Sequence, residues 1–289
     1  MTKPARLLVI AGSDSSGGAG IQADIKTATA LGAYAMTAIT AVTVQNTQGV
    51  HAVHPVPTNI VRAQIVSALE DIGADAIKIG MLGSAEVIRA VAQTLSAHAR
   101  DIPLVVDPVM EAKGGASLLE DDAPNTLMTS LFPLAVLITP NTPEASRLTG
   151  LPIESVADCL QAGQSLLATG AQAVLVKGGH LEGETVTDVL VSKSGSQRLT
   201  APRLDTTSTH GTGCTLATAI AVGLAQGMPL IEAIRRARSY VQEAIRTAPG
   251  FGHGHGPLNH MHMLNLPSVE TAAAVVAPNP SMRWGRPRI

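Results

Sequence analysis

The run THGTGCT at residues 209–215 holds the residue types that best suit chemistry on an anion. Gly211 and Gly213 stand one residue apart, directly before a stretch of small residues that predicts the start of a helix. The unpaired N–H groups and the positive dipole end of a helix N-terminus attract anions. The sequence therefore predicts an anion cradle here, although the same glycines also suit a simple turn between a strand and a helix.

Cys214 lies in the first turn of this predicted helix. The field of a helix N-terminus lowers the pKa of a thiol, so we expect the thiolate to be favoured at this position. A proton acceptor beside an anion cradle suits the transfer of a charged group, above all a phosphoryl group.

Composition limits the classes of function that this chain of 289 residues can have. Its formal net charge of −2 gives no basic footprint for nucleic acid or for a membrane surface. The only cysteines, Cys159 and Cys214, have no metal-ligand spacing and no disulfide framework, which fits a reducing cytoplasm. No apolar segment suits a secretion signal at the N-terminus, and the uncharged spans 27–61 and 206–231 contain too many small and polar residues to cross a membrane.

The elements that must position these residues alternate between strands and helices. Several predicted strands are apolar throughout, as in a parallel sheet that helices cover on both faces. We therefore predict one α/β domain over residues 1–266 and a flexible, proline-containing tail over 267–289. The predicted strands are 7–10, 38–44, 76–79, 104–106, 135–138, 174–176 and 186–191, and the predicted helices include 20–31, 60–72, 85–97, 156–168 and 230–248.

Polar residues follow one predicted strand after another. Asp107, Asn141 and Lys177 each come directly or shortly after an apolar run. Each of these residues alone could simply belong to a turn. The carboxyl ends of parallel strands, however, lie along one edge of the sheet, where ligands bind, so we expect these residues to lie together there. The sequence does not match two common nucleotide-binding motifs. No Gly-x-Gly-x-x-Gly motif follows the first predicted strand, and Gly211-Thr212-Gly213 lacks the third glycine of that motif. The Gly-Lys-Ser/Thr sequence of a phosphate-binding loop is also absent.

Seven blocks of sequence, in order between about residues 6 and 265, closely resemble the hydroxymethylpyrimidine and phosphomethylpyrimidine kinases of thiamine synthesis. The resemblance implies a ribokinase-like, three-layer αβα fold and a cytoplasmic, usually dimeric enzyme that uses ATP and Mg²⁺. It further implies phosphorylation of 4-amino-5-hydroxymethyl-2-methylpyrimidine to its monophosphate and then to its diphosphate. The blocks are AGSDSSGGAGIQAD (11–24), QNT (45–47), KIGML (78–82), DPVM (107–110), TPN (139–141), KGGH (177–180) and HGTGCT (210–215).

The resemblance also assigns roles to residues around the transferred phosphate. Residues 211–214 match the anion hole, with Gly211 and Gly213 as its glycines and Cys214 where many sugar kinases have an aspartate base. Lys177 is expected to neutralise the phosphate in flight, since electrostatics dominate this chemistry. Lys177, Asn141, Thr212 and Gly213 are the implied ATP-binding residues, and Asp107 and Glu144 the implied partners of Mg²⁺.

Two of these assignments compete with a purely structural role. Asn141 followed by Glu144 also fits a helix capping box, and both roles can coexist. Asp107 also suits a turn before Pro108.

The acceptor pocket depends most on Gln45, the family's reader of the pyrimidine. An amide side chain can accept from an exocyclic amine and donate to the adjacent ring nitrogen. Gly12, Asp24, Met81 and Val109 match family positions near the same ring. A turn without a ligand is the plain alternative for Gln45.

Two other functions are compatible with the same fold. A pyridoxal kinase is the nearest, because it belongs to the same superfamily. A nucleotide-sensing module without activity would be expected to have lost Lys177, Gly213 or Cys214, yet all three are present.

Overall fold

Strand β1 (Ala5–Asp14) is an interior strand of the sheet and is buried on both faces. In the computed structural model, which describes residues 3–112 and 114–264, the side chains of Leu7 and Val9 pack against one helical layer, whereas Leu8 and Ile10 pack against the other. This alternation follows from the two-residue period of a strand. A strand buried on both faces reads as an unbroken apolar run, as the sequence predicted.

Within the described residues the strands form one nine-stranded sheet in the order β3-β2-β1-β4-β5-β6-β7-β8-β9. The pairs from β2 to β7 are parallel, whereas β2–β3, β7–β8 and β8–β9 are antiparallel. The predicted fold class, a mainly parallel central sheet covered on both faces, is confirmed. The strands after β1 are β2 (Ala33–Asn46), β3 (Gly49–Pro55), β4 (Ala76–Ile79), β5 (Leu104–Val106), β6 (Leu137–Ile138), β7 (Ala173–Val176), β8 (Thr185–Ser192) and β9 (Gly195–Pro202).

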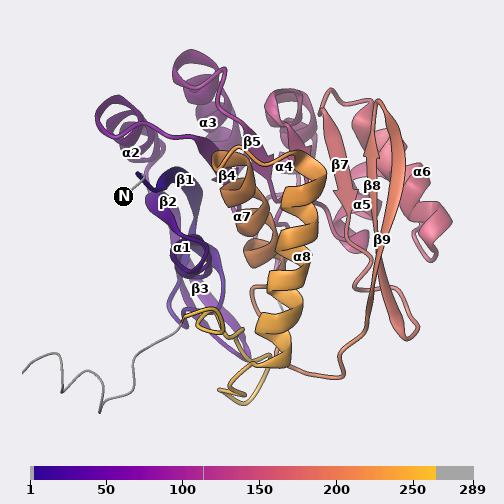
Figure 1. Cartoon of the computed structure of the whole chain (residues 1–289). Helices are drawn as coiled ribbons and strands as arrows, with labels where there is room; N and C mark the ends of the chain where they lie inside the picture. Colours follow the sequence, from indigo (N-terminus) through magenta and orange to yellow (C-terminus); the bar gives the residue numbers. More distant parts are fainter. Residues whose placement is uncertain (1–2, 113, 265–289) are drawn as a thin grey trace, which may run out of the picture.

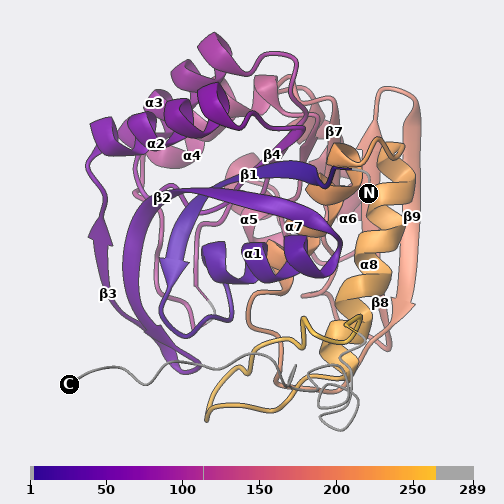
Figure 2. The same ribbon diagram turned by 60° about the vertical axis from the view of Figure 1, so that its left-hand side comes forward.

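The helices divide between the two faces of the sheet (Figures 1 and 2). One layer contains α1 (Gly20–Ala30), α7 (Thr212–Ala225) and α8 (Leu230–Arg246). The other contains α2 (Thr58–Asp71), α3 (Ala85–His98), α4 (Ala123–Thr126), α5 (Thr142–Thr149) and α6 (Val156–Leu167), with the short helical turns η1 (Leu127–Leu131) and η2 (Phe132–Leu134).

Packing explains the contrast between α7 and α8. Helix α7 is buried on nearly all sides and consists mostly of small residues, so neighbouring backbones approach it closely. A Cβ at Gly223 would lie only 2.6 Å from the Cβ of Ala233 on α8. Helix α8 buries one stripe and exposes Arg235 and Arg246, whereas Arg238 is mostly buried in an ion pair with Asp188.

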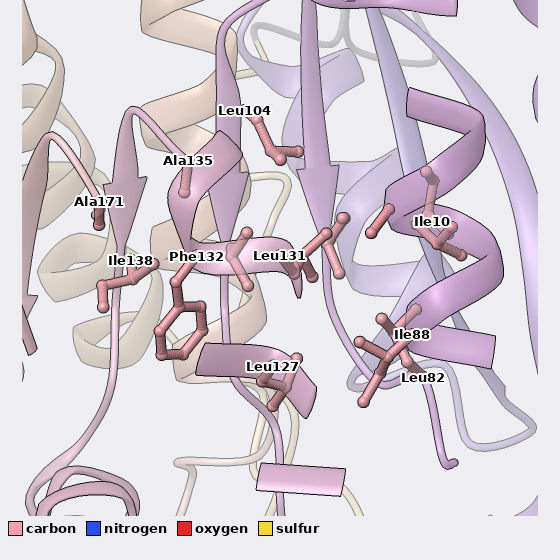
Figure 3. Packing of buried hydrophobic residues seen from close by; sticks show 14 of the residues in the cluster. Ile10, Leu82, Ile88, Leu104, Leu127, Leu131, Phe132, Ala135, Ile138 and Ala171 are labelled. Atoms are coloured by element: carbon pink, nitrogen blue, oxygen red, sulfur yellow. The ribbon is translucent and has the colours of Figure 1, made fainter. Parts of the chain in front are cut away.

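One predicted strand, before β6, is shorter than expected, and strands β3 and β9 were not predicted. Residues 135–138 were predicted as a strand, but only Leu137–Ile138 form one, because the turns η1 and η2 extend to Leu134. The residues before β6 are apolar because they are buried: Leu131, Phe132 and Ala135 pack in the core beside Ile138 (Figure 3). The predicted tail, residues 267–289, lies outside the described residues.

Candidate active site

The carboxyl ends of the central strands and the N-terminus of α7 line a cleft of about 460 Å³. This is the edge at which parallel α/β sheets bind ligands. Asp24 does not line the cleft, although the sequence placed it near the substrate ring. The other predicted site residues all do, namely Gly12, Gln45, Met81, Asp107, Val109, Asn141, Glu144, Lys177, Gly211, Thr212, Gly213 and Cys214.

The predicted anion cradle forms at the start of α7. Gly211 caps the helix with a φ of 81°, a left-handed conformation that favours glycine. A Cβ at this position would overlap the carbonyl oxygen of Gly18, so the loop before α7 lies directly against the loop after β1. Residues 211–214 line the cleft, and the first-turn amides of α7 have no partner within the helix, although the Thr212 amide donates to the Thr209 carbonyl at 3.4 Å.

Lys177 and Asp107 meet beside this cradle. Lys177 Nζ lies 2.8 Å from Asp107 Oδ1 and 4.0 Å from Glu144 Oε2. A Cβ at Gly213 would lie 3.2 Å from Lys177 Nζ and 3.5 Å from Asp107 Oδ2, so a side chain there would crowd both. Burial acts to lower the pKa of Lys177, but Asp107 and Glu144 hold it above its ordinary value. Lys177 therefore carries its positive charge beside the anion cradle.

Glu144 has a structural role and a chemical one. Its Oε2 accepts from the Asn141 amide at 2.7 Å, and Asn141 Oδ1 accepts from the Glu144 amide at 2.8 Å, which completes the predicted capping box of α5. Burial raises the pKa of Glu144 to about 7, against the pull of Lys177. The carboxyl group is thus fixed by the cap while it lines the cleft.

Cys214 does not have the ionisation state that its helix position predicted. Burial raises the pKa of its thiol to about 11, and the nearby charges of Asp24 and Asp107 add to this effect. Lys78 and the amide of Gly20 act in the opposite direction. The expectation that the helix start alone favours the thiolate is therefore corrected, because removal from water outweighs the helix field.

Asp24 forms an ion pair with Lys78, which itself lies in the cleft wall. Both side chains are fully buried, with Lys78 Nζ 3.1 Å from Asp24 Oδ1 and 2.8 Å from Oδ2. Thr218 donates to Asp24 Oδ1 at 2.6 Å. Burial raises the pKa of Asp24, and it also acts to lower the pKa of Lys78, but the charges of Asp24, Cys214 and Asp107 hold the lysine pKa above its ordinary value. With every oxygen of Asp24 hydrogen-bonded, we take the pair as ionised.

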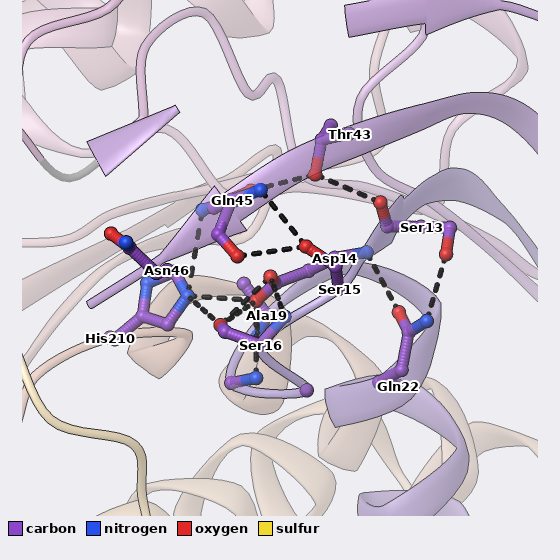
Figure 4. Close-up of polar contacts among 12 residues, drawn as sticks. Ser13, Asp14, Ser15, Ser16, Ala19, Gln22, Thr43, Gln45, Asn46 and His210 are labelled. Atoms are coloured by element: carbon purple, nitrogen blue, oxygen red, sulfur yellow. Dashed lines mark hydrogen bonds and ion pairs between the residues drawn. The ribbon is translucent and has the colours of Figure 1, made fainter. Parts of the chain in front are cut away.

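A third buried pair joins the loop after β1 to the loop before α7 (Figure 4). His210 Nε2 lies 2.8 Å from Asp14 Oδ2, which also accepts from the backbone amides of Gly18 and Ala19. Burial acts to raise the pKa of Asp14, but the hydrogen bonds from His210, Ser16 and these amides lower it to about 2. The carboxylate thus holds the two loops of the cleft together.

The predicted pyrimidine reader, Gln45, lies near the end of β2 rather than after it. Its amide is 3.2 Å from Thr43 Oγ1 and 3.5 Å from His210 Nε2, so contacts on two sides hold the side chain (Figure 4). Opposite, a Cβ at Gly12 would lie 3.1 Å from Met81 Sδ. Gly12 therefore leaves the space that Met81 occupies in the cleft wall.

Sequence reasoning missed Lys78, Asp14 and His210 as functional residues, although all three stand in the quoted motifs. A signal for Lys78 was present, since it interrupts the apolar run AIKI of β4. A lysine at the centre of a buried strand requires an ionic partner. The partner was not evident, because Asp24 lies 54 residues earlier in the chain. Among residues 3–112 and 114–264, no group of three or more His, Cys, Asp or Glu is arranged to hold a metal ion by itself.

Known proteins resemble this chain over most of its length. The family model described as phosphomethylpyrimidine kinase matches residues 14–259. A hydroxymethylpyrimidine/phosphomethylpyrimidine kinase of Streptomyces coelicolor is 47% identical over 257 residues, which cover 89% of this chain and 94% of the relative. The thiamine biosynthesis bifunctional protein ThiED of Geobacter sulfurreducens is 51% identical over 88% of this chain, which spans only 52% of that longer protein.

Solved structures extend the likeness to the fold. An ADP complex of Bacillus subtilis pyridoxal kinase superposes with a TM-score of 0.84 at 38% identity, covering 90% of this chain and 98% of that one. The part of the chain that the structure describes contains no helix with the length and apolar character needed to span a membrane.

Proposed function

The chain belongs to the phosphomethylpyrimidine kinase family, and on that premise we propose that it phosphorylates 4-amino-5-hydroxymethyl-2-methylpyrimidine and then the resulting monophosphate. ATP is the phosphoryl donor, and the diphosphate product serves the synthesis of thiamine diphosphate. The observation that carries the proposal is the convergence of Lys177, Asp107 and Gly213 at the N-terminus of α7, in the same cleft as Gln45.

The residues of the cleft suit an in-line phosphoryl transfer. The acceptor oxygen forms a bond to the γ-phosphorus while the bond from this phosphorus to the bridging oxygen of ADP breaks. The amides of residues 211–214 and the Lys177 ammonium stabilise the charge that moves from the γ-phosphate to ADP. In the first reaction, Cys214 would accept the proton that leaves the hydroxymethyl group in its thiolate form, which requires the thiol to lose its own proton first.

The carboxyl groups suit a hydrated Mg²⁺ on the phosphates of ATP. This ion usually takes one or two carboxylates and fills its other positions with water and phosphate oxygens, so it needs no cluster of protein ligands. Asp107 Oδ1 is occupied by Thr139 and Lys177, whereas Oδ2 faces the cradle at Gly213. Asp107 and Glu144 would hold the ion, and Asn141 and Thr212 would bind the nucleotide beside it. The bound ion would neutralise phosphate charge.

The acceptor ring would lie between Gln45 on β2 and the wall formed by Gly12, Met81 and Val109. Gln45 would pair with the amine and ring nitrogen of the aminopyrimidine. Asp24 would support this pocket from behind, through Lys78, rather than by contact with the ring. Pyridoxal phosphorylation is the second candidate, favoured by the superposition on a pyridoxal kinase.

The assembly and location proposed for the enzyme rest on its surface and cysteines. Val42 and Val44 are 47% and 57% exposed on one face of β2, opposite His54 and Ala52 of the edge strand β3. We propose that a second copy covers this face to form a homodimer, which sedimentation equilibrium would detect. The two free cysteines fit the cytoplasm. Small molecules, rather than nucleic acid or membranes, are the proposed partners.

A coupled assay of ADP release tests the proposal. We expect turnover with hydroxymethylpyrimidine and with its monophosphate, and weaker turnover with pyridoxal. Cys214→Ala should lower turnover of hydroxymethylpyrimidine by about 10²-fold, as expected for loss of a general base, while ATP binding by the backbone amides persists. Preference for pyridoxal over both pyrimidines would replace the proposed substrate, and near-normal turnover of Cys214→Ala would remove the thiol from the mechanism.

A further inference from the structure

The loop after β7 begins with Lys177 and is held against its neighbours on both sides. The Lys177 amide donates to the Pro140 carbonyl at 2.8 Å, and Lys177 forms an isolated backbone bridge with Asn141. A Cβ at Gly178 would overlap the carbonyl oxygen of Thr187 on β8, so glycine allows the loop to approach this strand closely. The start of the loop therefore lies between the segment after β6 and strand β8, and its backbone contacts both.

Asp188 on β8 holds the amide next to Lys177. Its Oδ1 accepts from the Gly178 N–H at 2.9 Å. The Asp188 side chain is only 8% exposed, and a carboxylate buried in a strand requires partners for both of its oxygens. The bond from Gly178 satisfies one oxygen, and it fixes the peptide group that joins Lys177 to Gly178.

Arg238 on α8 satisfies the other oxygen of Asp188. Its Nε donates to Asp188 Oδ2 at 2.8 Å, and the arginine side chain retains only 14% exposure. Its two terminal nitrogens donate to the carbonyl oxygens of Thr200 on β9 at 3.3 Å and of Val186 on β8 at 3.5 Å. A planar guanidinium with these partners has a fixed orientation, so Asp188 cannot rotate away from Gly178 without breaking the ion pair.

The rest of the loop is held separately by Arg203, which follows β9. Its Nε donates to the Gly183 carbonyl at 2.7 Å, one terminal nitrogen donates to the Gly179 carbonyl at 2.9 Å, and the other donates to the Leu181 carbonyl. Because Arg203 fixes this part of the loop, the ion pair between β8 and α8 acts mainly on the amide beside Lys177. Loss of that pair should therefore displace the lysine without unfolding the loop.

We propose that Asp188, held in place by Arg238, is a positioning residue for Lys177. By fixing the peptide group between Lys177 and Gly178, the carboxylate keeps the lysine ammonium beside Asp107 and the anion cradle. A shift of about 1 Å in a group that stabilises a transition state can cost about 10²-fold in rate. This inference rests on the proposed function, because it assigns Asp188 to the step in which Lys177 stabilises the transferred phosphoryl group.

Both members of the ion pair line the cleft, so direct contact with the nucleotide is the alternative role. A double-mutant cycle distinguishes the two roles, because the effects of residues that act through each other are not additive. Asp188→Ala is compared with the wild type, and Lys177→Met/Asp188→Ala is compared with Lys177→Met.

We expect Asp188→Ala to lower kcat by about 10- to 100-fold, with little change in the KM of the acceptor. In the Lys177→Met background the same substitution should change kcat by less than about threefold, because the group that it displaces is already missing. An unchanged kcat in Asp188→Ala, or equal losses in the two backgrounds, would overturn the proposal.

Asp75→Ala is the matched control. Asp75 also accepts from an arginine side chain and from a backbone amide, both of Arg6, but it does not line the cleft. Its substitution should leave kcat unchanged in both backgrounds, and a loss as large as that of Asp188→Ala would overturn the proposal. If Asp188→Ala does not fold, Asp188→Ala/Arg238→Met, which leaves no unpaired arginine, replaces it in the cycle under the same criteria.

Nucleotide binding gives a second measurement that needs no acceptor. Isothermal titration calorimetry measures the Kd of AMP-PCP, an ATP analogue, for the full-length proteins of the cycle with Mg²⁺ present. We expect Asp188→Ala to bind more weakly than the wild type, and Lys177→Met/Asp188→Ala to bind within about twofold of Lys177→Met. Equal weakening in both backgrounds would indicate direct contact and overturn the positioning role. A wrong acceptor assignment would abolish turnover of the pyrimidines by the wild type and leave this cycle intact.

Discussion

Two lysine–aspartate pairs flank the start of α7, and each has an N–O distance of 2.8 Å. Lys177 pairs with Asp107 and retains 12% exposure of its side chain at the cleft, with Glu144 as a second carboxylate 4.0 Å away. Lys78 pairs with Asp24, and neither side chain has any exposure. The same kind of ion pair thus occurs once with a partly exposed lysine and once with a fully buried one.

The two lysine–aspartate ion pairs differ in their exposure, and this difference suits them to different roles. Lys177 shares Asp107 with Thr139 and faces the anion cradle, so a phosphoryl group can reach its charge. Lys78 pairs with Asp24 and has no exposed side-chain surface, although it lies in the cleft wall. Substitutions at the first pair should therefore affect catalysis most, and substitutions at the second should affect folding as well.

The largest effect on stability is expected from Lys78→Met. It leaves the Asp24 carboxyl buried without its cation, and breaking a buried pair in this way costs about 3–5 kcal/mol. The double variant Asp24→Asn/Lys78→Met should regain most of this loss, because no charge remains buried. Urea unfolding followed by circular dichroism measures both values. If Lys78→Met lowered the unfolding free energy by less than about 1 kcal/mol, the Lys78–Asp24 pair would not have the structural role that its burial indicates.

Lys177→Met should affect catalysis rather than folding. We expect turnover to fall by about 10²–10³-fold, the size seen when one donor to transition-state charge is removed. The KM for the neutral pyrimidine should change little, and the unfolding free energy should fall less than in Lys78→Met, because water from the cleft can reach Asp107 and Glu144. Steady-state kinetics test this, and an effect limited to the KM of the pyrimidine would contradict the placement of Lys177.

The Asp14–His210 pair extends the comparison to a carboxylate held mainly by neutral donors. The pKa of Asp14 lies at about 2, below its ordinary value of 3.8. Its ionised form therefore stabilises the fold above about pH 4, and this contribution is lost as the pH falls towards 2. Asp14→Asn should lower the unfolding free energy by about 2 kcal/mol at pH 7, and the difference from wild type should close near pH 2. Thermal unfolding across this range measures it, and a constant difference would exclude the charge as its source.

The same contrast explains what the sequence could predict. The core strand β1 and the helix α8 were predicted because their apolar patterns are local. Strands β3 and β9 were not, because their side chains are mostly exposed and they are held by pairing with a neighbour. Motifs identified the cleft residues, whereas the state of Cys214 and the pairing of Lys78 depend on burial by distant segments, which no local pattern encodes.

The smallest expected effect concerns the acceptor side of the cleft, away from both lysine pairs. Gln45→Leu removes the amide that would pair with the aminopyrimidine edge, which pyridoxal lacks. Leaving a ligand's polar group unpaired costs about 1–3 kcal/mol, so we expect kcat/KM for hydroxymethylpyrimidine to fall about tenfold and any pyridoxal activity to change much less.

Gln48→Leu is the matched control for Gln45→Leu. Gln48 is exposed at the turn after β2 and does not line the cleft, so its substitution should leave both substrates unaffected. Competition kinetics with both acceptors in one reaction compare the two variants directly. Gln45 also contacts Thr43 and His210, so a merely structural role would reduce both activities equally. That outcome would show that Gln45 has a structural role and that the residues around Met81 recognise the substrate.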